Sequence, residues 1–94
     1  MTNYNAINNL VAKHQAGDGN ATTLLLTKFD NLLKQVAYKY SKKEPNLPFA
    51  DLYQHGIYVF LLLCKKYKLN TGVNFVGYAK QNFEHTFTNR MCEI

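Results

Sequence analysis

Asp51 and His55 are the two residues whose types and spacing come closest to a chemical site. Their i, i+4 spacing would place both on one face of a helix, where they could bind a metal or share a proton. We favour a plain surface pair, because His14 and His85 lie far away in sequence and complete no metal-ligand pattern. No two carboxylates pair convincingly for acid–base catalysis. The sequence therefore predicts no enzyme, no catalytic residue, no metal site and no cofactor.

The two cysteines, Cys64 and Cys92, show no metal-ligand spacing and form no CxxC motif. Cys64 lies in the apolar run of residues 57–64, which predicts a buried thiol. That run is far too short to span a bilayer, and the N-terminus lacks the basic-then-apolar pattern of a signal peptide. We therefore expect a reduced, cytoplasmic protein with no membrane partner.

The net charge of +5 favours an acidic partner such as nucleic acid, although solubility alone would explain it nearly as well. Hydrophobic residues make up 47% of the chain, which is enough for a packed core. A length of 94 residues suits one small domain, so we expect a single domain over residues 1–94.

Apolar residues recur at helical spacing through the whole chain, and no useful stretch alternates with a period of two. Glycines at 17 and 72 suit helix-ending turns, and Pro48 suits the first position of a helix. The sequence predicts an all-α fold, a small bundle of about four helices over residues 3–15, 21–41, 49–67 and 75–89.

The predicted third helix is apolar on more than one side. Its core stripe comprises Leu52, Gly56, Val59, Phe60, Leu63 and Tyr67. A second stripe points outward and comprises Asp51, Gln54, Tyr58, Leu61 and Lys65. A lone surface helix would be apolar on one side only, so we expect something to cover this helix on its second side.

The predicted fourth helix separates apolar from polar side chains. Its apolar stripe comprises Val76, Ala79, Phe83 and Phe87. The opposite side carries Tyr78, Gln81, Asn82 and His85. These four side chains are therefore expected on the side of the helix that faces away from the core.

Residues 49–79 resemble conserved region 2 of the sigma-70 superfamily of bacterial RNA polymerase sigma factors, and the resemblance extends more weakly over most of the chain. In that family an acidic-Leu-x-Gln-x-Gly helix leads to an aromatic residue and a Gly-x-x-Phe-x-x-Tyr-Ala turn. The residues that match in order and without a gap are Asp51, Leu52, Gln54, Gly56, Tyr67, Gly72, Phe75, Tyr78 and Ala79.

The resemblance implies that the third helix docks on the clamp coiled coil of the largest catalytic subunit of the RNA polymerase core. Two positions depart from the family pattern: His55 replaces an acidic residue and Ile57 replaces a polar one. The polymerase-binding residues that the resemblance implies are Asp51, Gln54, His55, Tyr58 and Leu61.

The resemblance also implies that the fourth helix recognises and melts the minus-ten promoter element by holding the bases of the non-template single strand. Gln81 and Asn82 stand where housekeeping sigma factors carry a pair of tryptophans. Phe75 suits the core and the DNA face equally well. The DNA-binding residues implied are Phe75, Tyr78, Lys80, Gln81, Asn82, His85 and Thr88, with Arg90 as a further phosphate contact.

The function expected from this resemblance is transcription initiation as a sigma-type module. It implies further partners: a second chain that reads the minus-thirty-five element, or an anti-sigma factor. The chain would be a fragment of a longer sigma factor or a stand-alone, co-sigma-like protein. The alternative is a regulatory binding module, derived from a phage or mobile element, that occupies the polymerase clamp or another protein without melting DNA.

Overall fold

Turn residues mark the join between the first two helices. The computed structural model describes residues 4–69 and 72–93. Gly17 adopts a positive φ of 99° after the first helix, and the Asp18 side chain caps the next by accepting from the N–H groups of Asn20 and Ala21. The helices are α1 Tyr4–Gln15, α2 Gly19–Lys28, α3 Asp30–Lys43, α4 Phe49–Lys66 and α5 Phe75–Asn89, followed by the 3₁₀ turn η1 Met91–Glu93.

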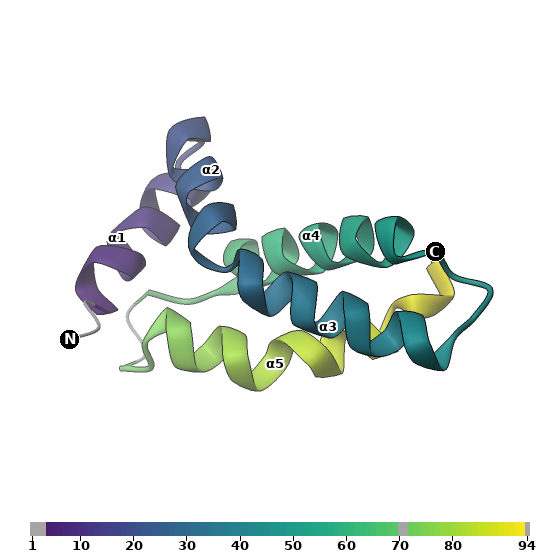
Figure 1. Cartoon of the computed structure of the whole chain (residues 1–94). Coiled ribbons are helices and arrows are strands. Elements are labelled where there is room, and N and C mark those ends of the chain that lie inside the picture. Colours follow the sequence, from purple (N-terminus) through teal and green to yellow (C-terminus); the bar gives the residue numbers. More distant parts are fainter. Residues whose placement is uncertain (1–3, 70–71, 94) are drawn as a thin grey trace.

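The helices α3, α4 and α5 form an elongated body, and the α1–α2 hairpin lies across one end of it (Figure 1). The molecule measures 39 × 26 × 24 Å along its principal axes. The N-terminal helix α1 packs against α4 and α5 as well as against α2. Every regular element in the described residues is helical, which confirms the predicted all-α class.

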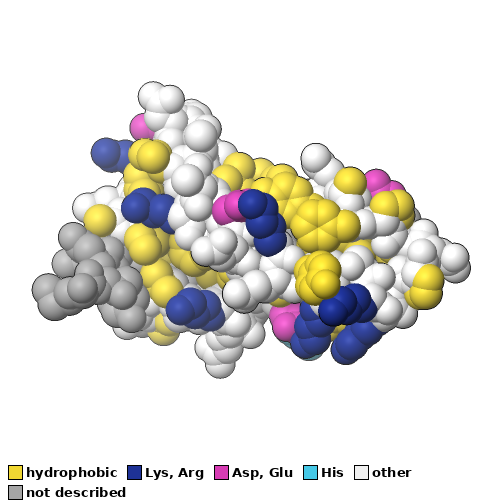
Figure 2. Space-filling model, viewed as in Figure 1, with side chains coloured by type: hydrophobic (Ala, Val, Ile, Leu, Met, Phe, Trp, Pro, Cys, Tyr) yellow, Lys and Arg dark blue, Asp and Glu magenta, His cyan; other side chains and the backbone are white. Residues whose placement is uncertain are grey.

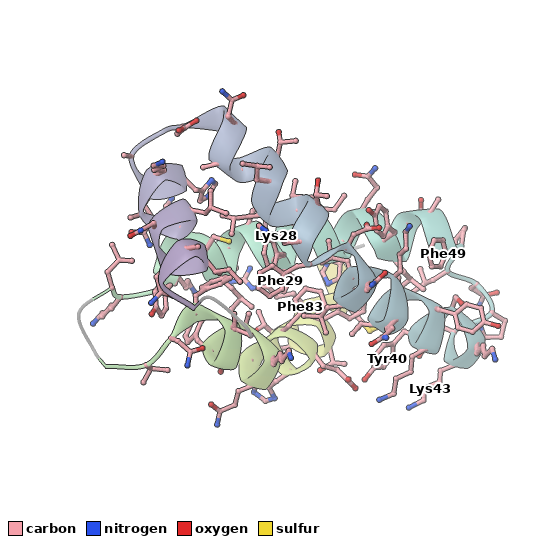
Figure 3. The ribbon with its side chains drawn as sticks, turned by 60° about the vertical axis from the view of Figure 1, so that its left-hand side comes forward. Lys28, Phe29, Tyr40, Lys43, Phe49 and Phe83 are labelled. Atoms are coloured by element: carbon pink, nitrogen blue, oxygen red, sulfur yellow. The ribbon has the colours of Figure 1, made fainter. Side chains whose placement is uncertain are left out.

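Residues 21–41 do not form the single helix that the sequence predicts. The helix breaks at Phe29, whose φ and ψ of −104° and 8° end α2 before α3 begins. Phe29, labelled in Figure 3, is buried at this break. Its ring centroid lies 5.0 Å from that of Phe60 and 5.7 Å from that of Phe75. The described residues therefore form five α-helices where about four were expected. Aromatic packing in the core favours a bend that the local pattern does not reveal.

The core is centred on α4. The core stripe that the sequence predicts for this helix is confirmed. The six residues of that stripe, Leu52, Gly56, Val59, Phe60, Leu63 and Tyr67, are all buried. The apolar stripe of α5 packs against them, so that a Cβ on Gly56 would lie 3.6 Å from the rings of both Phe83 and Phe87. Because α4 and α5 pack closely against each other, the side of each helix that faces solvent is fixed.

Side chains of α1 form hydrogen bonds to the end of α4 and to the start of α5. The Gln15 amide donates to the carbonyl oxygens of Cys64 and Tyr67, each at 2.8 Å, at the C-terminal end of α4. The Asn8 carboxamide oxygen accepts from the N–H of Phe75 at 3.0 Å. Asn74 caps α5, its side-chain oxygen accepting from the N–H of Gly77 at 2.8 Å.

Cys64 is the buried thiol that the sequence predicts. It is 0% exposed, and burial raises its pKa to about 12. Cys92 is exposed. Within the described residues, the helices are too short or too polar to cross a membrane.

Candidate protein- and nucleic-acid-binding faces

The outward stripe of α4 lies at the surface, as expected. Asp51, Gln54 and Lys65 are exposed, Tyr58 retains 48% of its accessible area, and Leu61 is half-buried. Opposite this stripe, α4 packs against the rest of the core. These side chains are therefore available to a second molecule.

His55 is not part of that surface, which corrects its assignment to the polymerase-binding residues. Its side chain is 7% exposed, its Nε2 is 3.0 Å from the carbonyl oxygen of Phe87, and its ring meets the Phe87 ring edge-on at 4.8 Å. His55 lies three residues after Leu52 and four before Val59, so it shares the buried side of α4. The expectation of a surface pair between Asp51 and His55 is wrong for the same reason.

A groove of about 660 Å³ runs between the C-terminal ends of α1 and α4. The outward stripe supplies Tyr58, Leu61 and Lys65 to its lining, and the remaining lining residues are His14, Gln15 and Leu62. The sequence pattern did not single out these last three for a binding face. Their proximity to the stripe depends on the long-range packing of α1 against α4, which helical periodicity does not encode.

The exposed side of α5 presents a smaller set of groups than the sequence predicts. Lys80, Gln81 and His85 are exposed. Tyr78 is half-buried, with its ring centroid 5.4 Å from that of Tyr67. One edge of the Tyr78 side chain is thus supported by the core while the rest faces solvent.

Two further candidate DNA-binding residues on α5 form hydrogen bonds within the helix. Asn82 is half-buried, and its amide donates to the carbonyl oxygen of Tyr78 at 2.8 Å. Thr88 is half-buried, and its hydroxyl donates to the carbonyl oxygen of His85 at 3.0 Å. Both remain next to the exposed face, but each would exchange an internal hydrogen bond for one to a ligand.

Phe75 cannot take part in DNA binding in this conformation, which corrects its assignment. It is 0% exposed, and its ring packs edge-on against Phe29, Phe60 and Tyr67 at centroid distances of 5.7, 5.9 and 5.3 Å. Its place four residues before Ala79 already puts it on the buried stripe of α5.

Lys and Arg side chains are spread over the face that Figure 2 presents, and the densest group lies beside apolar side chains over α3. The side chains of Tyr40 and Lys43 lie near each other on the C-terminal half of α3 (Figure 3). Lys39 and the Tyr40 hydroxyl both donate to the carboxylate of Glu84 on α5, at 2.7 and 2.8 Å. These bonds from Lys39 and Tyr40 lower the pKa of Glu84.

A second groove, of about 330 Å³, lies where α1 and α3 meet the start of α5. Lys28 and Lys80 lie on its lining with the polar side chains of Asn31 and Gln35. The groove places Lys80, one of the candidate DNA-binding residues, beside a lysine from α2. A positively charged, partly apolar depression of this kind suits an acidic ligand such as a nucleic-acid strand.

No cluster of three or more His, Cys, Asp or Glu side chains occurs within residues 4–69 and 72–93. Searches against protein-family models, curated proteins and solved structures found no match for the chain.

Proposed function

We propose that the chain is a sigma-type transcription-initiation module that binds the RNA polymerase core through α4 and non-template promoter DNA through α5. The observation that carries the proposal is the outward position of Asp51 and Gln54 on α4 and of Tyr78 on the adjacent helix α5. Gln54 and Leu61 remain accessible on α4, Tyr78 remains accessible on α5, and Gly72 adopts a positive φ of 80° in the segment between them.

The α4 face fits a protein partner. An apolar middle between polar ends is the composition expected of an interface patch. Tyr58 and Leu61 supply the apolar part, and Asp51 and Gln54 supply polar groups. In the proposed complex these four residues contact the clamp coiled coil of the largest catalytic subunit.

The α5 face fits a single strand. Tyr78 offers a ring for base stacking, Gln81 and His85 offer hydrogen-bonding groups, and Lys80 offers positive charge for a phosphate. Base–aromatic stacking is worth about 1–3 kcal/mol per base. With the tryptophan pair replaced by Gln81 and Asn82, and with Phe75 buried, we expect this module to hold an open strand and to melt duplex DNA weakly.

The experiment that tests the proposal is a pull-down of the full chain by a purified clamp coiled coil. Asp51→Ala and Gln54→Ala should each reduce retention, whereas Lys66→Ala, on an exposed residue of α4 outside the stripe, should not. Absence of binding by the unaltered chain would contradict the proposal.

The burial of Phe75 and the internal hydrogen bond of Asn82 also favour the alternative function, a regulatory module without melting activity. Such a module, derived from a phage or mobile element, would occupy the clamp or another protein. Fluorescence titration with minus-ten-like single strands separates the two functions. Clamp binding without salt-sensitive DNA binding would favour the regulator.

If the chain is a sigma-type module, another domain or a second chain in the same cytoplasmic complex would recognise the minus-thirty-five element. An anti-sigma factor would compete for the α4 face. Co-purification of the chain with core polymerase, with and without such a second chain, tests whether it acts as one half of a two-part factor.

A further inference from the structure

The outward stripe of α4 has the spacing of a helix-docking seam. Asp51, Gln54, Tyr58, Leu61 and Lys65 follow one another at intervals of three, four, three and four residues. This is the spacing of the a and d positions in a heptad, which stays in line when two helices pack at a crossing angle of about 20°. The stripe therefore suits a partner helix that lies along α4.

The end of α1 turns the last part of this seam into a groove. Leu61 and Leu62 give it apolar side chains, and Tyr58 contributes a ring that is 48% exposed. Gln15 forms part of the lining, and its two hydrogen bonds to the end of α4 keep that wall in place. Apolar side chains of a partner helix would lose contact with water here.

The charged side chains along the seam change sign from one end to the other. Asp51 is in the first turn of α4 and Lys65 is in its last turn, 14 residues and about 21 Å further along the helix. Among the residues that the structure describes, the groove lining includes Lys65 and no carboxylate. Arg90 adds a guanidinium beside the middle of the seam, 3.4 Å from the Tyr58 hydroxyl. Opposite charges at matching positions fix the orientation of a partner.

We propose that the seam and groove bind one amphipathic helix of a partner protein that carries basic residues opposite Asp51 and acidic residues opposite Lys65, about four turns away. Between these ends the partner presents apolar residues to Tyr58, Leu61 and Leu62. The inference rests on the proposed function for its choice of face, and it specifies the chemistry of the partner helix on that face.

The test uses a synthetic amphipathic helical peptide of about 21 residues as the partner. It carries apolar residues at heptad a and d positions, lysines in its first two turns and glutamates in its last two. Its affinity for the full-length chain is measured by fluorescence anisotropy. Two peptides with the same apolar stripe, but with lysines or glutamates at both ends, should bind more weakly.

Charge reversal on the chain gives the sharper result. Asp51→Lys and Lys65→Glu should each weaken binding of the mixed peptide by about three- to tenfold. The double variant should restore binding, because the peptide can then bind with its direction reversed. Lys66→Glu makes the same charge change outside the groove and should change the affinity less than about twofold. Leu62→Ser should weaken binding without any change of charge, and thermal melts check that each variant folds.

Several outcomes would overturn the inference. These are no binding of the mixed peptide, equal effects of Lys65→Glu and Lys66→Glu, or tighter binding by Asp51→Lys with no rescue in the double variant. Clamp binding that ignores Lys65→Glu and Leu62→Ser would leave the proposed function standing and overturn this inference. Peptide binding with rescue, together with no clamp binding, would contradict the proposed function and support the inference.

Discussion

Cys64 and Cys92 differ in their access to solvent, and their reactivity should differ with it. Burial raises the pKa of Cys64 to about 12, so almost none of it is thiolate near neutral pH, whereas Cys92 is exposed. A thiol-reactive dye at pH 8 should label one cysteine per folded chain and both in denaturant. Cys92→Ser should abolish the fast labelling. Rapid labelling of that variant would show that α4 is not packed as described.

Tyr78 is the residue on which single-strand binding should depend most. Its ring is half-buried against Tyr67, which holds it in place for stacking. Tyr78→Ala should weaken binding of a minus-ten-like oligonucleotide about tenfold, since one stacking contact is lost. Tyr78→Phe keeps the ring and should bind nearly normally. Equal losses in the two variants would assign the effect to the hydroxyl instead of to stacking.

Glu84 should make stability depend on pH in the acid range. The hydrogen bonds from Lys39 and Tyr40 lower its pKa, so the carboxylate stabilises the folded state above the unfolded-state pKa. That contribution is lost as the pH falls through the lowered pKa. Thermal melts from about pH 5 to pH 3 should show a falling Tm, with a smaller fall in Glu84→Gln.

Asp30, whose pKa is lowered by bonds from Lys34 and Tyr53, adds a second acid-sensitive contribution that the Glu84 variant leaves intact. Glu44→Gln, at an exposed position beyond α3, is the matched control and should retain the full decrease of Tm. A decrease of the same size in all three proteins would contradict the role of Glu84.

Two wrong residue assignments could have been avoided from the sequence. His55 lies between Leu52 and Val59 on the buried side of α4, and Phe75 lies one turn before Ala79 on the buried side of α5. Helical spacing alone assigns both to the interior.

Among the helices, α1 should contribute more than its length suggests, because Gln15 satisfies two carbonyl groups at the end of α4. Gln15→Ala should lower the free energy of unfolding by about 0.5–1.5 kcal/mol, since two part-buried hydrogen bonds are lost and water can replace them in part. Gln35→Ala, on an exposed residue of α3, should have little effect. Denaturant unfolding measures both, and equal losses would contradict this role of α1.

The bend between α2 and α3 marks the limit of prediction from local pattern. Leu25, Phe29 and Leu33 are spaced as in a continuous helix, and all three are buried. The spacing therefore agrees with one helix or with two. What decides between them is the packing of the Phe29 ring on Phe60 and Phe75, residues that are distant in sequence.

For the molecule as a whole, periodicity predicted the helical class and the inner and outer sides of α4 and α5, because burial of one stripe follows from its spacing. It could not predict the two grooves. One depends on α1 meeting α4, and the other on α1 and α3 meeting the start of α5. Both arise from long-range packing, and each adds lining residues next to a face that the sequence had indicated.

The central claim is that one domain binds two partners on two separate faces. Amide chemical-shift mapping of the isotope-labelled chain tests it most directly, with the clamp coiled coil and a minus-ten-like single strand added in turn. The account predicts that the coiled coil shifts the amides of Gln54, Tyr58 and Leu61, and that the oligonucleotide shifts those of Tyr78, Lys80 and Gln81. Shifts in one shared set of residues, or none with either partner, would contradict it.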